Sequence, residues 1–509
     1  TDRAGVFVQL MQRLLPTEGP GEEGEGLDHV FEGLRAASEK LLADRRQPPA
    51  RLFRLLAALM RFAVEFYRQR LEFIDAVMAL AAGLATRSAP ETLADPAVAA
   101  CLVEVITRPM RSLSLQVLRL REFGAVARLL EPEKKRVALE ICTAVAASRT
   151  FIDSEKLLQT VLGFLEPLLA PEATPEEVLR LARALHFVRA ASPRRTLALL
   201  RVLETRLSRG NRLHQRHLFP LLSRGCLEVL ARAAAMRAFV AEEPGRSLAG
   251  FALEGGAAVR LEEEEAAGVG PEDAEVEVMG VAVLLMGWAE RLELDFPALA
   301  LQLWVEALGA VDRFALTEEV DECVYHCASR ALLLLEGELG LARDLPFNWR
   351  RLAGAVGNLE RASVAVREQL TGLLRAAVAL LPPPEEQARA LLSLAGQFRR
   401  LSSFERAKEC IQRALALLQR ALRANRRALP ALGCFLESLL PAIAAETPLF
   451  PAREAQSCLA FIERACQDLL AEGSVSGAEL ESMVRGQVQR VCAFWTAQSL
   501  PEELSAVLG

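Results

Sequence analysis

The segment ITRPMRSLSLQVLRLREFGAVARLL, residues 106–130, indicates the fold class. Its leucines recur at helical spacing, its arginines fill much of the remainder, and Pro109 and Gly124 interrupt it. Pro109 suits the first turn of a helix, where its missing N–H costs nothing, and Gly124 begins the next apolar run. The segment predicts one helix and part of a second. Leu118 is assigned to the apolar seam, so Leu118→Asp is expected to cost about 3 kcal/mol or more by burying a charge there.

The same pattern continues along the chain as amphipathic helices of roughly 15 to 20 residues separated by short breaks. Hydrophobic residues make up 52% of the sequence, Ala and Leu dominate, and there are only 2 Tyr and 4 Trp. Such a composition favours helices. So many short helices cannot share one core, but stacked neighbours can bury each other. The predicted fold is all-α: an α-solenoid of irregular HEAT-like antiparallel helix pairs.

Composition divides the predicted solenoid into parts. Residues 1–239 form its N-terminal part, and residues 278–509 form its C-terminal part. Between them, residues 240–277 are rich in Gly and Glu and are predicted to be an acidic loop or a disordered insertion. The acidic run Glu262–Glu265 is interpreted as a solubilising feature of that insertion.

Charge and cysteine usage exclude several classes of protein. The net charge of −6 gives no reason to expect nucleic acid as a partner. No run of about 20 uncharged apolar residues suggests a membrane span. The ten cysteines are scattered through apolar patterns, which favours reduced thiols and a cytosolic setting. They are Cys101, Cys142, Cys226, Cys323, Cys327, Cys410, Cys434, Cys458, Cys466 and Cys492.

Two clusters resemble metal sites at first sight. Cys323, His326 and Cys327 share a helix face, but a structural zinc needs four ligands and no second cluster accompanies them. We interpret the set as core packing. His214 and His217 lie among arginines, and we interpret them as part of a solvated basic loop, with a docking patch as the alternative. No metal or cofactor is predicted.

Catalytic motifs are missing from the sequence. It contains no G-x-S-x-G, glycine-rich phosphate loop, H-E-x-x-H or kinase signature. Carboxylates are plentiful, but their pairing across a cleft does not follow from helix faces. We therefore predict that the protein is not an enzyme.

Five segments, in chain order, resemble the large subunit of retromer, the vacuolar protein sorting-associated protein 35 family. In the clearest of them, residues 117–123 read VLRLREF where the family has V-L-K-L-K-H-F. The others are FYRQRLEFIDAVM (66–78), GNRLHQRHLFPLL (210–222), PALALQLWVEALGAVDRF (297–314) and RAKECIQRALAL (406–417). The resemblance spans most of the chain, and the shared order of these short matches supports it.

The resemblance implies a non-enzymatic scaffold of the retromer coat, cytoplasmic and peripheral on the endosome membrane. Such a scaffold helps retrieve transmembrane cargo to the Golgi or plasma membrane, together with sorting nexins and regulatory proteins. The family's C-terminal half cups a metallophosphoesterase-like subunit, which implies that role for the segment from Val278 to about Trp495. The portion that grips the arrestin-like subunit is expected to lie outside this chain, which would be the C-terminal portion of the family's subunit.

Individual contacts do not follow from the resemblance. Aromatic residues in the C-terminal part are candidate partner anchors, with core packing as the alternative for each: Phe347, Trp349, Phe398 and Phe404. Glu336 and Glu338 match the acidic side of the family's self-association contact. Pro382 and Pro383 replace its lysines, which weakens electrostatic pairing and puts the homodimer in doubt.

Two rival interpretations remain. The first is the related large subunit of the retriever assembly, which shares the fold and the phosphoesterase-like partner but sorts different cargo. The second is a generic HEAT-like adaptor or transport scaffold. Binding of the phosphoesterase-like subunit would separate the retromer and retriever interpretations from the generic adaptor.

Overall fold

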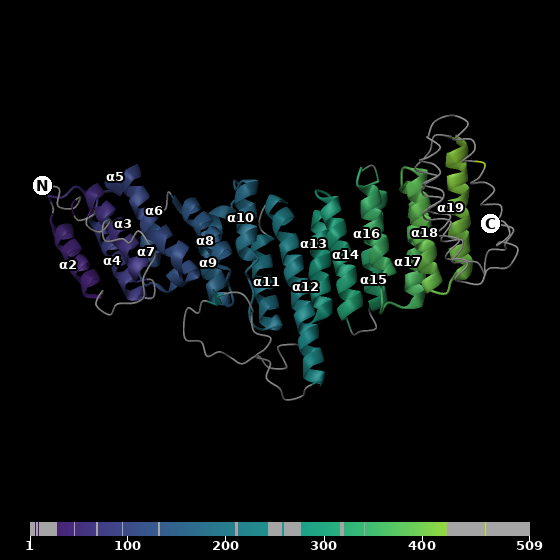
Figure 1. Cartoon of the computed structure of the whole chain (residues 1–509), viewed down its shortest axis with the longest axis horizontal. Helices are drawn as coiled ribbons and strands as arrows, with labels where there is room; N and C mark the ends of the chain where they lie inside the picture. The colour runs from purple at the N-terminus through teal and green to yellow at the C-terminus, as the bar shows by residue number, and fades with distance from the viewer. Residues whose placement is uncertain are drawn as a thin grey trace. The chain divides into compact units, whose positions relative to one another are not determined.

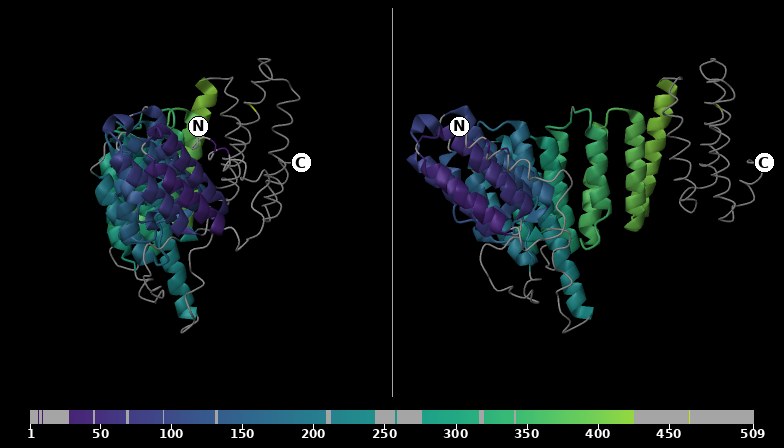
Figure 2. Two further views of the ribbon diagram at one scale, coloured as in Figure 1. Left: turned by 90° about the vertical axis from the view of Figure 1, so that its left-hand side faces the viewer. Right: turned by 60° about the vertical axis from the view of Figure 1, so that its left-hand side comes forward.

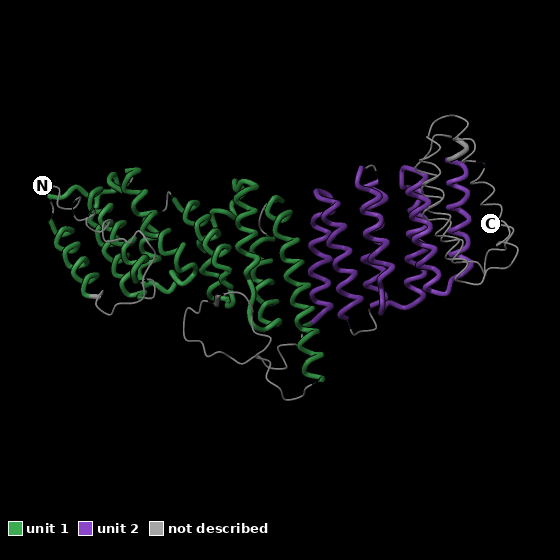
Figure 3. Tube along the Cα trace, in the orientation of Figure 1, with its two compact units in different colours: residues 1–276 green, residues 277–509 purple. Residues whose placement is uncertain are grey.

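The computed structural model describes most of the chain between Asp28 and Ala424. The described residues are 28–424 without 45, 68–69, 94, 131–132, 209–211, 243–256, 259–275, 316–319 and 341, together with Val6, Gln9 and Arg464. The helices predicted after Ala424, the acidic run Glu262–Glu265 and the turn predicted at Arg68–Gln69 lie outside them. The chain divides into two compact units, Thr1–Val276 and Glu277–Gly509 (Figure 3).

The first unit is built from helices that follow one another in chain order (Figure 1). They are α2 (Asp28–Ala43), α3 (Pro49–Phe66), α4 (Leu71–Arg87), α5 (Pro90–Leu93), α6 (Pro96–Leu113), the 3₁₀ helix η1 (Ser114–Arg119), α7 (Phe123–Leu129), α8 (Lys134–Ser148), α9 (Glu155–Leu169), α10 (Pro175–Leu185), α11 (Pro193–Leu207) and α12 (Arg212–Glu242). Two short strands, β1 (Thr150–Phe151) and β2 (Ala257–Ala258), pair in parallel.

The second unit continues the pattern with helices standing side by side, as Figure 2 shows. They are α13 (Val278–Leu292), α14 (Pro297–Phe314), α15 (Val320–Glu336), α16 (Leu345–Gly357), α17 (Val364–Ala377), the 3₁₀ helix η5 (Val378–Leu380), α18 (Pro384–Arg400) and α19 (Phe404–Ala424). Helices α14, α16 and α18 contact one another in turn, while α15 contacts α17. Alternate helices therefore form two layers, which is the arrangement of HEAT-like pairs.

Local sequence explains where many of these helices begin. Proline occupies the first turn of α3, α6, α10, α11, α14, α16 and α18, where its fixed φ suits a helix and its missing N–H is not needed. Asp95 caps α6 by accepting a hydrogen bond from the Ala97 N–H at 2.9 Å. Thr174 and Glu177 form a complete capping box at the start of α10.

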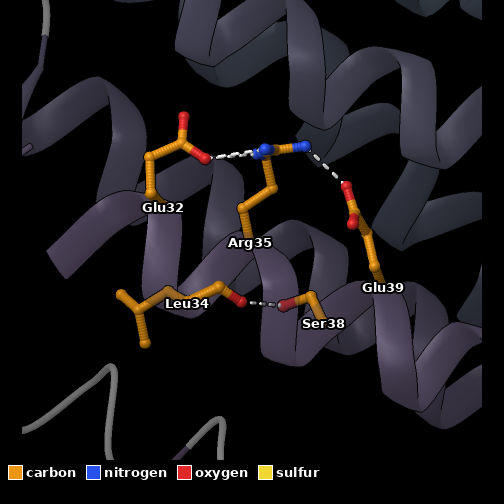
Figure 4. Close-up of polar contacts among 5 residues, drawn as sticks. All are labelled: Glu32, Leu34, Arg35, Ser38 and Glu39. Atoms are coloured by element: carbon orange, nitrogen blue, oxygen red, sulfur yellow. Dashed lines mark hydrogen bonds and ion pairs between the residues drawn. The ribbon is translucent and has the colours of Figure 1, made fainter. Parts of the chain in front are cut away.

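Most of the longer helices bury an apolar face and expose a charged one. On α2, Arg35 forms ion pairs with Glu32 and Glu39 on the exposed side, at 2.7 and 2.6 Å (Figure 4). On the buried side, the Ser38 hydroxyl is satisfied by donating to the Leu34 carbonyl at 2.8 Å. Leu, Val, Ala and Phe fill the interior between helices. The fold is an all-α solenoid of stacked helices, as predicted.

The segment 106–130 departs from its prediction. Pro109 does not begin a helix; it lies inside α6, which continues to Leu113. The chain then tightens into η1, and α7 begins at Phe123, so Gly124 does lie at the start of the next helix. Leu118 is only half-buried, whereas Val117 is 1% exposed, because the 3₁₀ turn rotates the buried side by one residue.

The predicted basic loop around His214 is also wrong. Residues from Arg212 onward form α12, and His214 is fully buried within it. Its Nε2–H donates to the Leu168 carbonyl at 2.8 Å, which satisfies the imidazole in the core. Helix α12 also runs to Glu242, past the predicted boundary at residue 239. Of the insertion 240–277, the described strand β2 pairs with β1 in the register Thr150 to Ala257.

Candidate partner-binding surface

The C-x-x-H-C cluster on α15 is built into the packing of the second unit. Cys327 is fully buried, and burial raises the pKa of its thiol to about 12. The exposed His326 ring stands edge-on against Trp304, with centroids 5.6 Å apart. Among the residues that the structure describes, no group of three or more His, Cys, Asp or Glu is placed to hold a metal. Only Cys327 packs in the core, with an unreactive thiol, whereas Cys323 is half-buried and His326 is exposed, so the interpretation as core packing holds for Cys327 alone.

The four predicted anchors divide between core and surface. Trp349 is 1% exposed on α16, and Phe398 is fully buried on α18 beneath the Arg406 guanidinium, 5.9 Å from the ring centroid. Both rings are used for packing, so neither is available as an anchor. Phe347 is 63% exposed on α16 and Phe404 is 45% exposed at the start of α19. These two rings remain candidates.

Helix geometry explains why Trp349 is buried and Phe347 is exposed. Phe347 and Trp349 lie two residues apart on one helix, so their side chains are rotated by about 200° and cannot share a face. Trp349 is on the face that contains the buried Leu352, Ala353 and Val356. Phe347 therefore points away from the core, and this could have been inferred from the sequence alone.

The sequence analysis missed further exposed apolar side chains in the second unit. Val283 on α13 is 60% exposed, and Leu333 on α15 is 57% exposed. Leu333 lies within the run Leu332–Leu335, and four consecutive helical positions cannot all face one side. The run of four leucines was therefore the sequence signal that at least one of them is exposed. Single exposed apolar side chains are common on proteins, so Val283 and Leu333 alone do not indicate a binding site.

The acidic residues proposed for self-association lie together at one end of α15. Glu336 is its last residue, Glu338 lies in the turn that follows, and both are exposed. Pro382 and Pro383, which stand where the family's lysines are expected, are also exposed, just before α18. The end of α15 therefore exposes two carboxylates close together in the sequence.

The loop between α16 and α17 is the most strongly organised polar feature of this unit. Asp312, 5% exposed near the end of α14, accepts hydrogen bonds from the backbone N–H groups of Glu360, Arg361 and Ala362 at 2.8, 3.0 and 2.9 Å. Asp321 accepts from the Ser363 N–H at 2.7 Å, and that bond, with the Ser363 side chain, lowers the pKa of the Asp321 carboxyl. The loop is held in one conformation by its neighbours.

No helix in the described part of the chain is both long and apolar enough to cross a membrane. Stacked helix pairs with buried aromatic rings define a helical-repeat scaffold, a class that presents surface to partners.

The model of the family vacuolar protein sorting-associated protein 35 matches residues 2–439. The chain belongs to this family, a non-enzymatic scaffold subunit of retromer that acts in vacuolar protein sorting as a peripheral component on endosomes.

Two of the solved structures that match this chain are distant in sequence. A circular tandem repeat protein with novel repeat topology and enhanced subunit contact surfaces aligns with 99% of this chain and 94% of its own, at 16% identity and a TM-score of 0.23. The structure of Naa15/Naa10 bound to HypK-THB aligns with 97% of this chain and 79% of its own, at 10% identity and a TM-score of 0.15. No curated protein matches the chain.

Proposed function

We propose that this chain is the retromer scaffold that binds the phosphoesterase-like subunit through the helices of its second unit. In this role it supports retrieval of transmembrane cargo from endosomes, with sorting nexins and the arrestin-like subunit as further members of the coat. The observation that supports it most is membership of the family over residues 2–439. The helices α13–α19 belong to the part of the chain that the resemblance implicates in cupping that subunit.

Phe347 and Phe404 are the proposed anchors of this contact. A large aromatic ring exposed to water gains from burial on binding, and aromatic residues dominate the energetics of many interfaces. Phe347 is 63% exposed and Phe404 is 45% exposed, and a bound partner would cover this exposed surface. Trp349 and Phe398 contribute indirectly, because they fix α16 and α18 in the stack.

The proposal is tested by calorimetric titration of the whole chain with the phosphoesterase-like retromer subunit. We expect saturable one-to-one binding, weakened at least about tenfold by Phe347→Ala or Phe404→Ala, an effect of about 1.4 kcal/mol. Leu179→Ala is the matched control, because Leu179 is 42% exposed on α10 in the first unit. No binding by the folded chain, or an equal loss in the control, would contradict the proposal.

We also propose that Glu336 and Glu338 contribute to any self-association of this chain. Both carboxylates are exposed at the end of α15, but Pro382 and Pro383 supply no positive charge opposite them. We expect association between copies to be weak and to fall with rising salt. Sedimentation velocity of the wild type and of Glu336→Gln/Glu338→Gln measures it. A tight dimer that is indifferent to salt would rule out this contact.

A further inference from the structure

A polar cavity of about 400 Å³ lies in the second unit where α14, α16, α17 and α18 come together. We call it the α16–α17 cavity. Arg313 from α14, Arg367 from α17 and Arg400 from α18 line it. Glu360 is the acidic residue in its wall, so the lining carries a formal excess of two positive charges. Neither of the proposed anchors, Phe347 and Phe404, lines this cavity.

The wall of the cavity is preformed. Asp312 holds the loop at Glu360 by the backbone hydrogen bonds already described. Gln397 Nε2 donates to the Ala353 carbonyl at 2.7 Å, which ties α18 to α16. Gly357 permits that approach, because a Cβ there would lie 2.5 Å from Gln397 Nε2. A ligand would therefore meet a rigid site and would not have to order the loop.

The guanidinium groups retain most of their hydrogen-bonding capacity. Arg367 Nη1 donates to the Leu359 carbonyl at 3.1 Å, and Arg400 Nη1 donates to the Gly357 carbonyl at 3.3 Å. These bonds cap carbonyls where α16 ends, and each uses one of the five N–H donors of an arginine. Arg313 has no hydrogen bond or ion pair with any residue that the structure describes.

Buried polar atoms in the same wall are unsatisfied. Within the described residues, Arg367 Nε and Gln397 Oε1 are buried and have no hydrogen-bond partner. The Gln397 residue as a whole is 5% exposed. Leaving such groups unpaired is costly, and few are found in folded proteins. The accessible part of the wall adds the exposed Asn358 amide and Glu360 carboxylate to the three arginines, so it is suited to a ligand that carries both an anionic group and hydroxyl groups.

We propose that the α16–α17 cavity binds a phosphate monoester on a compact polyol, such as an inositol phosphate. A phosphate monoester carries a charge of about −1.5 to −2 and accepts several hydrogen bonds, which matches three arginines and the local excess charge. A single carboxylate would offset less of that charge. The polyol hydroxyls would donate to the Glu360 carboxylate and to the amide oxygens in the wall. The same group occurs as a free metabolite and as a lipid headgroup.

The test is a calorimetric titration of the whole chain with inositol trisphosphate. We expect one saturable site, weakened at least about tenfold in Arg313→Gln/Arg400→Gln because two charge-assisted contacts are lost. Arg350→Gln is the matched control, since Arg350 is an exposed arginine on α16 outside the cavity. We expect Arg313→Gln to leave the fold intact, because the Arg313 side chain bonds to no described residue, and circular dichroism checks folding for each variant.

Sedimentation with phosphatidylcholine vesicles, with and without a phosphatidylinositol phosphate, distinguishes the two sources. Co-sedimentation that needs the phosphorylated lipid and Arg313 assigns a headgroup, and binding of soluble inositol trisphosphate alone assigns the free ligand. No saturable binding to either probe, or equal weakening in Arg350→Gln, overturns the proposal. Tighter binding of a phosphoserine peptide than of inositol trisphosphate would overturn the polyol assignment.

Discussion

The joint between α6 and α7 in the first unit and the joint between α16 and α17 in the second are stabilised by different interactions. In the first, residues 114–122, the 3₁₀ turn buries Leu115, Val117 and Leu120, each 6% exposed or less. One carboxylate contact supports it: Asp75 accepts from the Glu122 N–H at 3.0 Å. In the second, residues 358–363, four backbone N–H groups bond to Asp312 and Asp321.

The difference shows that a solenoid joint can depend mainly on apolar burial or mainly on charge. The first joint should tolerate changes of pH and fail when a charge enters its core. The second should fail when its carboxylates are removed, because the loop N–H groups would then be buried without partners. The predictions below test this comparison, in order of decreasing expected effect.

The largest effect is expected from Val117→Asp in the first joint. Val117 is 1% exposed, so the new carboxylate would be desolvated, at a cost of about 4 kcal/mol or more in the free energy of unfolding. Denaturant unfolding followed by circular dichroism measures it. Leu118→Asp is the matched control and should cost clearly less, because Leu118 is half-buried. Equal costs would show that the 3₁₀ turn does not set the buried side.

Asp312→Ala should have the next largest effect, about 3 kcal/mol, because it leaves three loop N–H groups without an acceptor. Amide hydrogen exchange of residues 360–362 provides a local readout, and protection there should fall more than in α13. A variant with unchanged exchange in this loop would mean that the loop is held by the buried Leu359 and Ala362 alone.

Much of this contrast could not be derived from the sequence. The amphipathic pattern predicted successive helices of roughly 15 to 20 residues, and the structure contains helices of that length. Asp312, however, bonds to donors 48 to 50 residues later, and no local pattern reveals such a partner. The prediction that His214 lies in a solvated loop was wrong for the same reason, because the group that accepts its hydrogen bond is the carbonyl of Leu168 on another helix. The difference in exposure between Phe347 and Trp349 could have been predicted from the sequence, because it follows from the rotation between positions on one helix.

Asp75→Ala should destabilise the first joint by only about 1 kcal/mol, because a single backbone hydrogen bond to Glu122 is lost. Comparing the loss of unfolding free energy with that of Asp312→Ala shows how the cost depends on the number of N–H donors that each carboxylate accepts from. Both variants are measured by denaturant unfolding under the same conditions. A cost for Asp75→Ala as large as that for Asp312→Ala would remove the distinction between an apolar joint and a charged one.

The smallest effect concerns pH and the carboxylate at the edge of the second joint. Hydrogen bonds from Ser363 lower the pKa of Asp321, so the folded chain binds this proton less readily than the unfolded chain. The resulting stabilisation is complete above the unfolded carboxyl's pKa of about 3.9 and is lost as pH falls through the lower folded pKa. Asp321→Asn should therefore lower stability near neutral pH and flatten the decline in acid. Glu322→Gln, an exposed neighbour on α15, is the control, and an Asp321→Asn curve parallel to the wild type would contradict the assignment.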